Sequence, residues 1–216
     1  MGGSGRGCAI LSVMSTASVT PRPGLGVLAD RVFPRSSTLV DVGLVVAGAA
    51  VVGLLAQAEW RIGPVPITGQ TLGVMLVGGA LGMRRGAAAL TTYLLAGLMG
   101  APVFAGGGFG PAYVLAPSFG FVLGFIGAAA IAGWAAERAW DRHVVLALGG
   151  FLLATVAPFV VGVPWMATAL GMSDPSAILA AGVTPFIVPG LVKAAVAAAV
   201  FPLAWRLVGR LDSRRR

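Results

Sequence analysis

The chain has 216 residues, of which 57% are hydrophobic and only 10% charged, and its mean hydropathy is +0.93. Because soluble domains usually carry about a quarter charged residues, this composition predicts an integral membrane protein. The net charge of +8 does not indicate nucleic-acid binding, since the basic residues form short clusters between apolar segments. One cysteine, Cys8, and one histidine, His143, exclude a disulfide framework and a thiol- or histidine-based metal centre.

Residues 1–35 are rich in Gly, Ser, Pro and Arg and lack the apolar core and cleavage site of a signal peptide. We predict that they form a disordered cytoplasmic tail. The true start stays open between Met1 and Met14. Residues 36–210 are predicted to form one membrane domain, followed by a basic cytoplasmic tail at residues 211–216.

Six apolar segments are each long enough to cross a bilayer, which takes roughly 20 apolar residues, or somewhat fewer where neighbouring helices cover the ends. They predict an all-α fold with six transmembrane helices, over Thr38–Ala58, Ile67–Met83, Gly86–Val103, Ser118–Ala136, Val144–Leu170 and Pro185–Leu207. The second and third are rich in glycine and are joined only by Arg84 and Arg85, so we expect a tight hairpin of helices.

The first segment carries a patch of small residues, with Ala49 and Gly53 four apart on one face of the helix. Such a face suits close docking of another helix. The spacing does not say whether that helix is internal or belongs to a partner.

The sequence PVPITGQT, residues 64–71, begins the second segment with polar side chains. Thr68 could cap the helix, which is a sufficient structural role. Gln70 must find partners for an amide that both donates and accepts hydrogen bonds. Contact with a ligand and hydrogen bonding between helices are both open for Gln70.

The stretch Gly97–Phe125 separates the third and fourth segments with an uncharged linker whose glycines and prolines cannot form a regular helix. Irregular backbone at membrane depth is tolerated only where it packs in protein or lines a cavity. We therefore predict an irregular, glycine-rich loop that forms a binding site. Aromatic side chains beside free backbone N–H groups suit a small heterocycle, although packing at the headgroup level would give the same pattern; the residues concerned are Phe104, Gly106, Gly107 and Tyr113.

Lys193 lies within the last apolar segment. Inserting a lysine at the centre of a spanning helix costs about 2.5 to 3.5 kcal/mol, so such residues normally have a partner. If Pro189 occupies the first helical turn, the helix dipole adds positive potential near Lys193. We predict a socket for a carboxylate or another acceptor-rich ligand, with a lysine that extends to the outer interface as the alternative.

Thirteen of the 15 Lys and Arg residues lie in the two tails and in the second-to-third and fourth-to-fifth loops. This asymmetry predicts that both termini are cytoplasmic and that the glycine-rich loop opens outward. The predicted interior offers only Lys193 as an ionisable group, which argues against an enzyme. The sequence also lacks a Walker motif, so the chain cannot drive transport by hydrolysing ATP itself.

Six sequence blocks, in this order, resemble the BioY family, the biotin-specific S components of energy-coupling factor (ECF) transporters: VPITGQTL, LGMRRGA, GLMGAPVFAGG, APSFGFVLGF, GVPWMA and PFIVPGLVKA. The resemblance covers residues 27–210. It implies a six-helix S-component fold in a prokaryotic cell membrane and an outward-facing biotin pocket. It further implies a separate transmembrane coupling subunit with two ATPase subunits, which would dock on the face around Ala49 and Gly53.

By this resemblance, Lys193 and Gln70 match the family's pocket lysine and glutamine. The chain departs from the family where it has Gly190 for an aspartate, Thr155 for an asparagine and Phe121 for a tyrosine. The predicted function is biotin uptake without a bound cofactor. The alternatives are an S component or facilitator for another small vitamin or a precursor such as dethiobiotin, and a membrane scaffold that transports nothing. The predicted substrate-binding residues are Lys193, Gln70, Thr68, Phe104, Gly106, Gly107, Tyr113, Phe121 and Thr155.

Overall fold

The computed structural model describes residues 26–34 and 37–214, with side chains as far as Arg210, so the predictions about Cys8 and Met14 lie outside the described residues. The chain is mainly helical, as predicted. The helices are α1 (Leu28–Val32), α2 (Thr38–Ala56), α3 (Gln70–Leu81), α4 (Met83–Leu98), α5 (Phe119–Glu137), α6 (Val144–Ala169), α7 (Pro175–Gly182) and α8 (Thr184–Arg214). Shorter elements are strands β1 (Glu59–Trp60) and β2 (Ile67–Thr68) and the 3₁₀ turns η1 (Ala105–Gly107), η2 (Pro111–Leu115) and η3 (Trp140–Arg142).

Within the described residues, four helical segments are long and apolar enough to cross a membrane: Thr38–Ala56, Phe119–Glu137, Val144–Ala169 and Pro175–Arg210. The second and third predicted segments do form helices, joined as expected by a very short connection. With 12 and 16 residues, α3 and α4 are only about 18 and 24 Å long at 1.5 Å per residue. Both fall short of the roughly 30 Å hydrocarbon layer, so a count of six crossing helices remains a prediction.

Helix α5 is the centre of the bundle. Of the 18 residues in its most apolar stretch, 67% are buried. The corresponding share is 28% in each of the other three candidate spans. It packs against α3, α4 and α6, and glycines permit the close approach. A Cβ atom on Gly78 of α3 would lie 2.5 Å from the carbonyl oxygen of Ala129, and one on Gly124 of α5 would lie 2.5 Å from Cα of Pro158 in α6.

The small-residue face of α2 is used inside the molecule. Ala49 is 8% exposed and Gly53 is buried, and a Cβ atom on Gly53 would lie 3.3 Å from Cβ of Val103. This face packs on the neighbouring helices and on the chain after α4. Ala49 and Gly53 are therefore not available to a partner helix, contrary to what the resemblance implied. The small residues left exposed on α2 are Gly43, Ala47 and Ala50.

Part of the predicted N-terminal tail has regular structure, because residues 26–34 include the helix α1. Val27 and Ala29 are buried, and the carboxylate of Asp30 accepts a hydrogen bond from Arg85 at 2.6 Å. The guanidinium of Arg142 also donates to the carbonyl oxygen of Gly26 at 3.3 Å. Apolar burial and two basic anchors therefore hold this segment, and at the other terminus α8 continues through residue 214.

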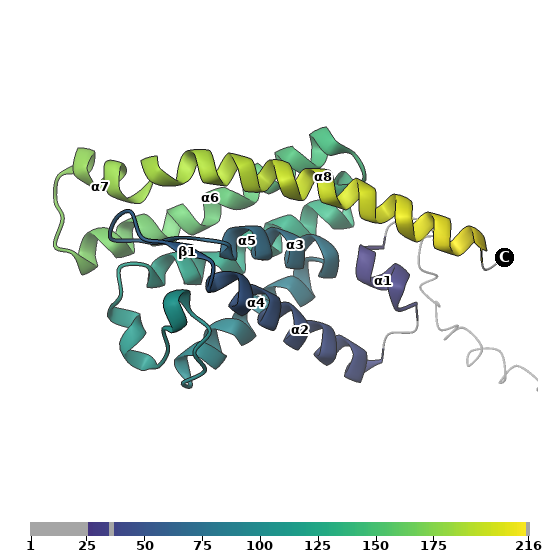
Figure 1. The fold of residues 1–216 in the computed structure, drawn as a ribbon, viewed down its shortest axis with the longest axis horizontal. Helices are drawn as coiled ribbons and strands as arrows, with labels where there is room; N and C mark the ends of the chain where they lie inside the picture. The colour runs from purple at the N-terminus through teal and green to yellow at the C-terminus, as the bar shows by residue number, and fades with distance from the viewer. Residues whose placement is uncertain (1–25, 35–36, 215–216) are drawn as a thin grey trace, which may run out of the picture.

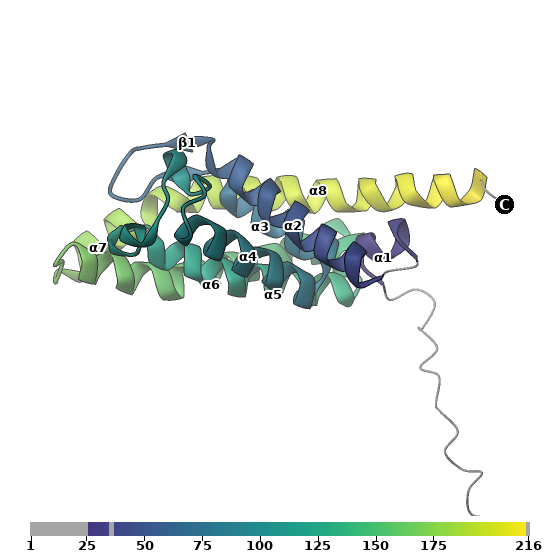
Figure 2. The same cartoon turned by 90° about the horizontal axis from the view of Figure 1, so that it is seen from below.

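The two ends of the bundle differ in structure. The hairpin of β1 and β2 lies at one end together with α7, whereas α1 and the C-terminal end of α8 lie at the other, in both views (Figure 1, Figure 2). The hairpin is antiparallel, with Glu59 opposite Thr68 and Trp60 opposite Ile67. Its second strand ends at Thr68, two residues before α3, and Thr68 lines the pocket described below.

Candidate functional site

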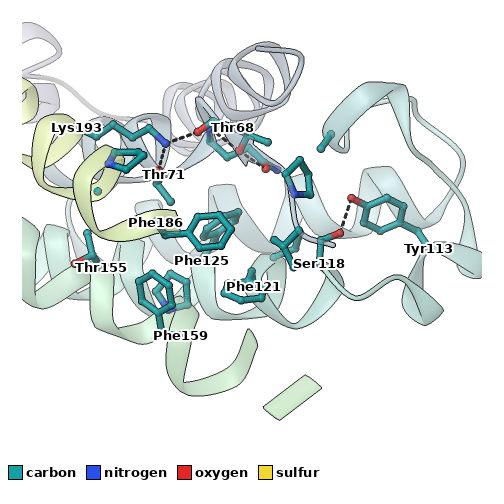
Figure 3. A pocket seen from close by; sticks show the side chains of 18 residues that line it. Thr68, Thr71, Tyr113, Ser118, Phe121, Phe125, Thr155, Phe159, Phe186 and Lys193 are labelled. Carbon is teal, nitrogen blue, oxygen red and sulfur yellow. Dashed lines mark hydrogen bonds between the residues drawn. The ribbon is translucent and has the colours of Figure 1, made fainter. Parts of the chain in front are cut away.

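A pocket of about 660 Å³, a volume that includes its open mouth, lies at the hairpin end of the bundle (Figure 3). The hairpin, the η1–η2 loop and helices α3, α5, α6 and α8 all contribute to its wall. The lining residues are Val65, Pro66, Thr68, Gln70, Thr71, Ala105, Tyr113, Ser118, Phe121, Val122, Phe125, Thr155, Pro158, Phe159, Phe186, Pro189, Gly190 and Lys193. None of these described lining residues is acidic.

Lys193 extends across the pocket wall from α8 toward the start of α3. Its Nζ atom donates to the carbonyl oxygen of Thr68 at 2.5 Å and to Oγ1 of Thr71 at 2.9 Å. These bonds hold the ammonium group at the pocket wall. Because an ammonium group has three N–H donors, one remains for a ligand acceptor.

Gln70 is 4% exposed, and both ends of its amide have partners within the protein. Its Nε2 donates to the hydroxyl of Tyr93 on α4 at 2.6 Å, and its Oε1 accepts from Oγ1 of Thr68 at 2.7 Å. Of the two roles left open by the sequence, the structure therefore shows hydrogen bonding between helices. Gln70 lines the pocket but contributes mainly by fixing Thr68, whose carbonyl oxygen holds Lys193.

Three phenylalanines from three helices form an aromatic cluster on the pocket wall. The ring centroids of Phe121 on α5, Phe159 on α6 and Phe186 on α8 are 6.0 to 6.1 Å apart in every pair. Such separations allow edge-to-face and tilted contacts that add to the apolar burial. Figure 3 shows Lys193 on one side of this cluster and Tyr113 with Ser118 on the other.

Thr155 and Gly190, two of the positions that the sequence analysis singled out, line the pocket. The hydroxyl of Thr155 donates to the carbonyl oxygen of Leu152 at 2.6 Å, so only its acceptor capacity is free. No atom lies within 4 Å of a Cβ built on Gly190. The pocket therefore has open space where a longer side chain would reach toward Lys193.

The glycine run differs from the prediction, because Phe104, Gly106 and Gly107 are absent from the described pocket wall. Phe104 is fully buried behind Tyr113, with ring centroids 4.4 Å apart. Gly106 faces the ion pair of Glu59 and Arg61, and the N–H of Gly107 donates to the side chain of Gln57. The turn thus directs these backbone groups toward α2 and the hairpin and away from the pocket.

Tyr113 and Ser118 supply the polar groups on this side of the wall. Their hydroxyl oxygens are 3.2 Å apart and share one hydrogen bond. Burial raises the pKa of the Tyr113 hydroxyl above its ordinary value of 10.0, so the group stays protonated and able to donate. A ligand with both donors and acceptors can bind this pair.

Sequence reasoning missed several lining residues, although helical spacing links them to predicted ones. Phe125 and Phe159 lie four residues, about one helical turn, after Phe121 and Thr155, and Phe186 lies seven residues before Lys193. Residues at these spacings share a helix face. Thr71 is a small hydroxyl residue beside the stronger candidate Gln70, and Ser118 lies at the start of α5 with no polar candidate beside it.

Comparison with known proteins supports the fold and the resemblance. Residues 30–210 match the profile of the family described as the BioY family. The chain is 37% identical to the biotin transporter BioY of Rhizobium etli, over 74% of this chain and 88% of the relative. It is 36% identical to the probable biotin transporter BioY of Pyrococcus horikoshii, over 73% and 91%.

A solved structure shares the fold. The S-component for biotin from an ECF-type ABC transporter superposes with a TM-score of 0.70, covering 80% of this chain and 95% of that one at 22% sequence identity. The helical arrangement that carries the pocket is therefore that of a known membrane fold.

Proposed function

The chain belongs to the BioY family, and on that premise we propose that it takes up biotin by capturing the vitamin in the pocket beside Lys193. The observation that carries the proposal is the composition of the wall, which combines aromatic side chains with one ammonium group and has no acidic residue among the described lining residues. Biotin has an apolar ring and chain between a ureido group and a carboxylate. A mainly apolar pocket with few polar groups suits such a ligand.

The binding mode follows from the two polar sides of the pocket. Lys193 would bind the carboxylate through its remaining N–H, because a charge-assisted bond best compensates a partly buried ammonium group. Phe121, Phe159 and Phe186 would contact the apolar part. Tyr113 and Ser118, on the other side of the phenylalanines, would meet the ureido group, which both donates and accepts hydrogen bonds.

We propose that α3 and α4 complete a set of six membrane-crossing helices and that both termini are cytoplasmic in a prokaryotic cell membrane. Support comes from the basic residues, since Arg85 and Arg142 bond to the α1 segment, at the end of the bundle away from the pocket. In a variant without Cys8, Arg84→Cys should react with an impermeant thiol reagent only from the cytoplasmic side. Labelling from the outside would contradict this topology.

We further propose that uptake is powered by a separate ECF coupling subunit with two ATPases. The solved structure that shares the fold is the S-component for biotin from an ECF-type ABC transporter. Because Ala49 and Gly53 are internal, a partner helix would meet the exposed face of α2 at Gly43, Ala47 and Ala50. Small residues there would allow close approach of the two helices.

Equilibrium binding to the purified protein tests the function. Saturable binding of biotin is expected, with biocytin and biotin methyl ester as weaker competitors because neither offers the free carboxylate of biotin. Stronger binding of dethiobiotin or another vitamin would contradict biotin as the preferred substrate, and no vitamin binding at all would favour a scaffold. Neither alternative is favoured by the relatives, which are named as biotin transporters.

A further inference from the structure

We propose that Gln57 is a positioning residue for biotin binding, which fixes the loop that supports the outer wall of the pocket. The inference rests on the proposed function, because the wall concerned is the one that would meet the ureido group. Gln57 follows the last residue of α2 and does not line the pocket. It acts through the η1 turn.

The side-chain amide of Gln57 uses both its ends. Its Nε2 donates to the carbonyl oxygen of Gly53 at 2.9 Å, within its own helix, and to that of Phe104 at 3.2 Å. Its Oε1 accepts from the backbone N–H of Gly107 at 3.0 Å. One side chain therefore joins the end of α2 to both sides of the η1 turn.

The hydrogen bonds within the η1 turn are local, and Gln57 adds the bonds that join the turn to α2. The N–H of Gly107 reaches the carbonyl oxygen of Phe104 at 3.1 Å, and that of Gly108 reaches Ala105 at 3.2 Å. Gly106 and Gly107 have φ values of +63° and +72°, in the left-handed region that glycine adopts readily. The local bonds shape the turn, whereas Gln57 fixes its place relative to α2.

The position of the turn determines the position of the wall. The ring of Phe104 stacks on Tyr113 at an interplanar angle of 26°, with the centroids 4.4 Å apart. A Cβ on Gly108 would lie 2.6 Å from the Tyr113 ring, so the ring rests directly on the backbone of the turn. Ala105, within the turn, itself lines the pocket, and Tyr113 shares a hydrogen bond with Ser118. A displaced turn therefore displaces Tyr113.

Two variants of Gln57 separate its bonds. Gln57→Ala removes the donor and the acceptor, whereas Gln57→Glu keeps an oxygen for the N–H of Gly107 and loses the donor to Phe104. Phe109→Ala is the matched control, because Phe109 is an exposed residue of the same loop outside the pocket wall. The measurements are the dissociation rate of biotin, hydrogen exchange at Gly107 in the ligand-free protein, and the melting temperature.

Gln57→Ala should raise the dissociation rate about three- to tenfold, as expected for the loss of the two hydrogen bonds that join Gln57 to the turn. It should also speed exchange at Gly107 while the melting temperature stays near that of the wild type. Gln57→Glu should affect exchange at Gly107 less, because it keeps an acceptor for that N–H, whereas it should still raise the dissociation rate, because a carboxylate oxygen would face the carbonyl oxygens of Gly53 and Phe104. Phe109→Ala should change neither. An unchanged dissociation rate in Gln57→Ala, or unchanged exchange at Gly107, would overturn the proposal.

A wild-type protein that does not bind biotin would instead overturn the proposed function. The exchange data need no ligand, so they would still decide whether Gln57 holds the η1 turn.

Discussion

Replacing Lys193 with methionine tests the assignment of the ligand carboxylate. Methionine keeps an unbranched apolar stem of similar length, so the change removes the ammonium group while most of the packing remains. The free protein uses two donors of Nζ, on Thr68 and Thr71, and the ligand would gain the third. A hydrogen bond to a charged group is worth about 1.5 to 3 kcal/mol, which corresponds to a loss of affinity of about 10- to 150-fold.

The assay is titration of biotin and of its methyl ester into wild type and Lys193→Met. The wild type should bind biotin more tightly than the methyl ester, by a factor close to the loss of biotin affinity that Lys193→Met causes. Lys193→Met should bind biotin and the methyl ester with equal affinity. Thr71→Val is the matched control, because it removes one partner of Nζ and keeps the charge, so it should retain the preference. Biotin affinity in Lys193→Met within about threefold of wild type, or a preference for the acid that persists, would refute the reasoning.

Three further predictions, tested with four substitutions, probe the packing and electrostatics around the site. Ala49→Leu should lower the melting temperature, since overpacking a buried site costs about 1 to 3 kcal/mol. Ala47→Leu, on the exposed face of α2, should leave biotin binding unchanged and reduce only partner-driven uptake. Equal melting temperatures of the two variants would contradict the assigned faces. Tyr93→Phe removes the acceptor of the buried Gln70 amide and should destabilise the protein by about 1 to 3 kcal/mol; an unchanged unfolding curve would show that this bond contributes little. Burial raises the pKa of Asp141 above its ordinary value of 3.8, although Trp205 donates to its carboxylate. Ionisation of Asp141 therefore opposes folding increasingly as the pH rises from 3.8 to the raised pKa. Over that interval the melting temperature of the wild type should fall relative to that of Asp141→Asn. Above the raised pKa the two melting temperatures should differ by a constant amount. Curves that stay parallel throughout would contradict the raised pKa.

The sequence predicted those site residues whose chemistry conflicts with an apolar helix. A lysine or a buried glutamine among apolar residues must have a partner, and Lys193 and Gln70 do lie on one pocket wall. Thr155 and Phe121 also line it. Their positions were inferred from the family resemblance alone, as the places where the chain has threonine for an asparagine and phenylalanine for a tyrosine.

The same reasoning failed where the backbone is irregular. Glycines indicate where the chain turns, but they do not indicate which way the free N–H groups point. In this fold Gln57 takes the N–H of Gly107, a contact between residues 50 positions apart in the sequence. Likewise, the small residues Ala49 and Gly53 predicted a close contact, but the spacing did not indicate that Gly53 would meet Val103, in the chain after α4. In both cases the missing information was the identity of the opposing surface.

The hydrogen bonds within the pocket wall limit what the site can recognise. The amide of Gln70 is bonded at both ends within the protein, and the hydroxyl proton of Thr155 goes to its own helix. Free hydrogen-bonding capacity is therefore concentrated at Lys193 on one side and at Tyr113 with Ser118 on the other. Polar discrimination should depend on the two ends of a ligand, because a polar group placed between them would meet phenylalanine rings and lose its hydrogen bonds to water. This arrangement selects for a molecule that is polar at both ends and apolar in between, which is the distribution of polarity in biotin.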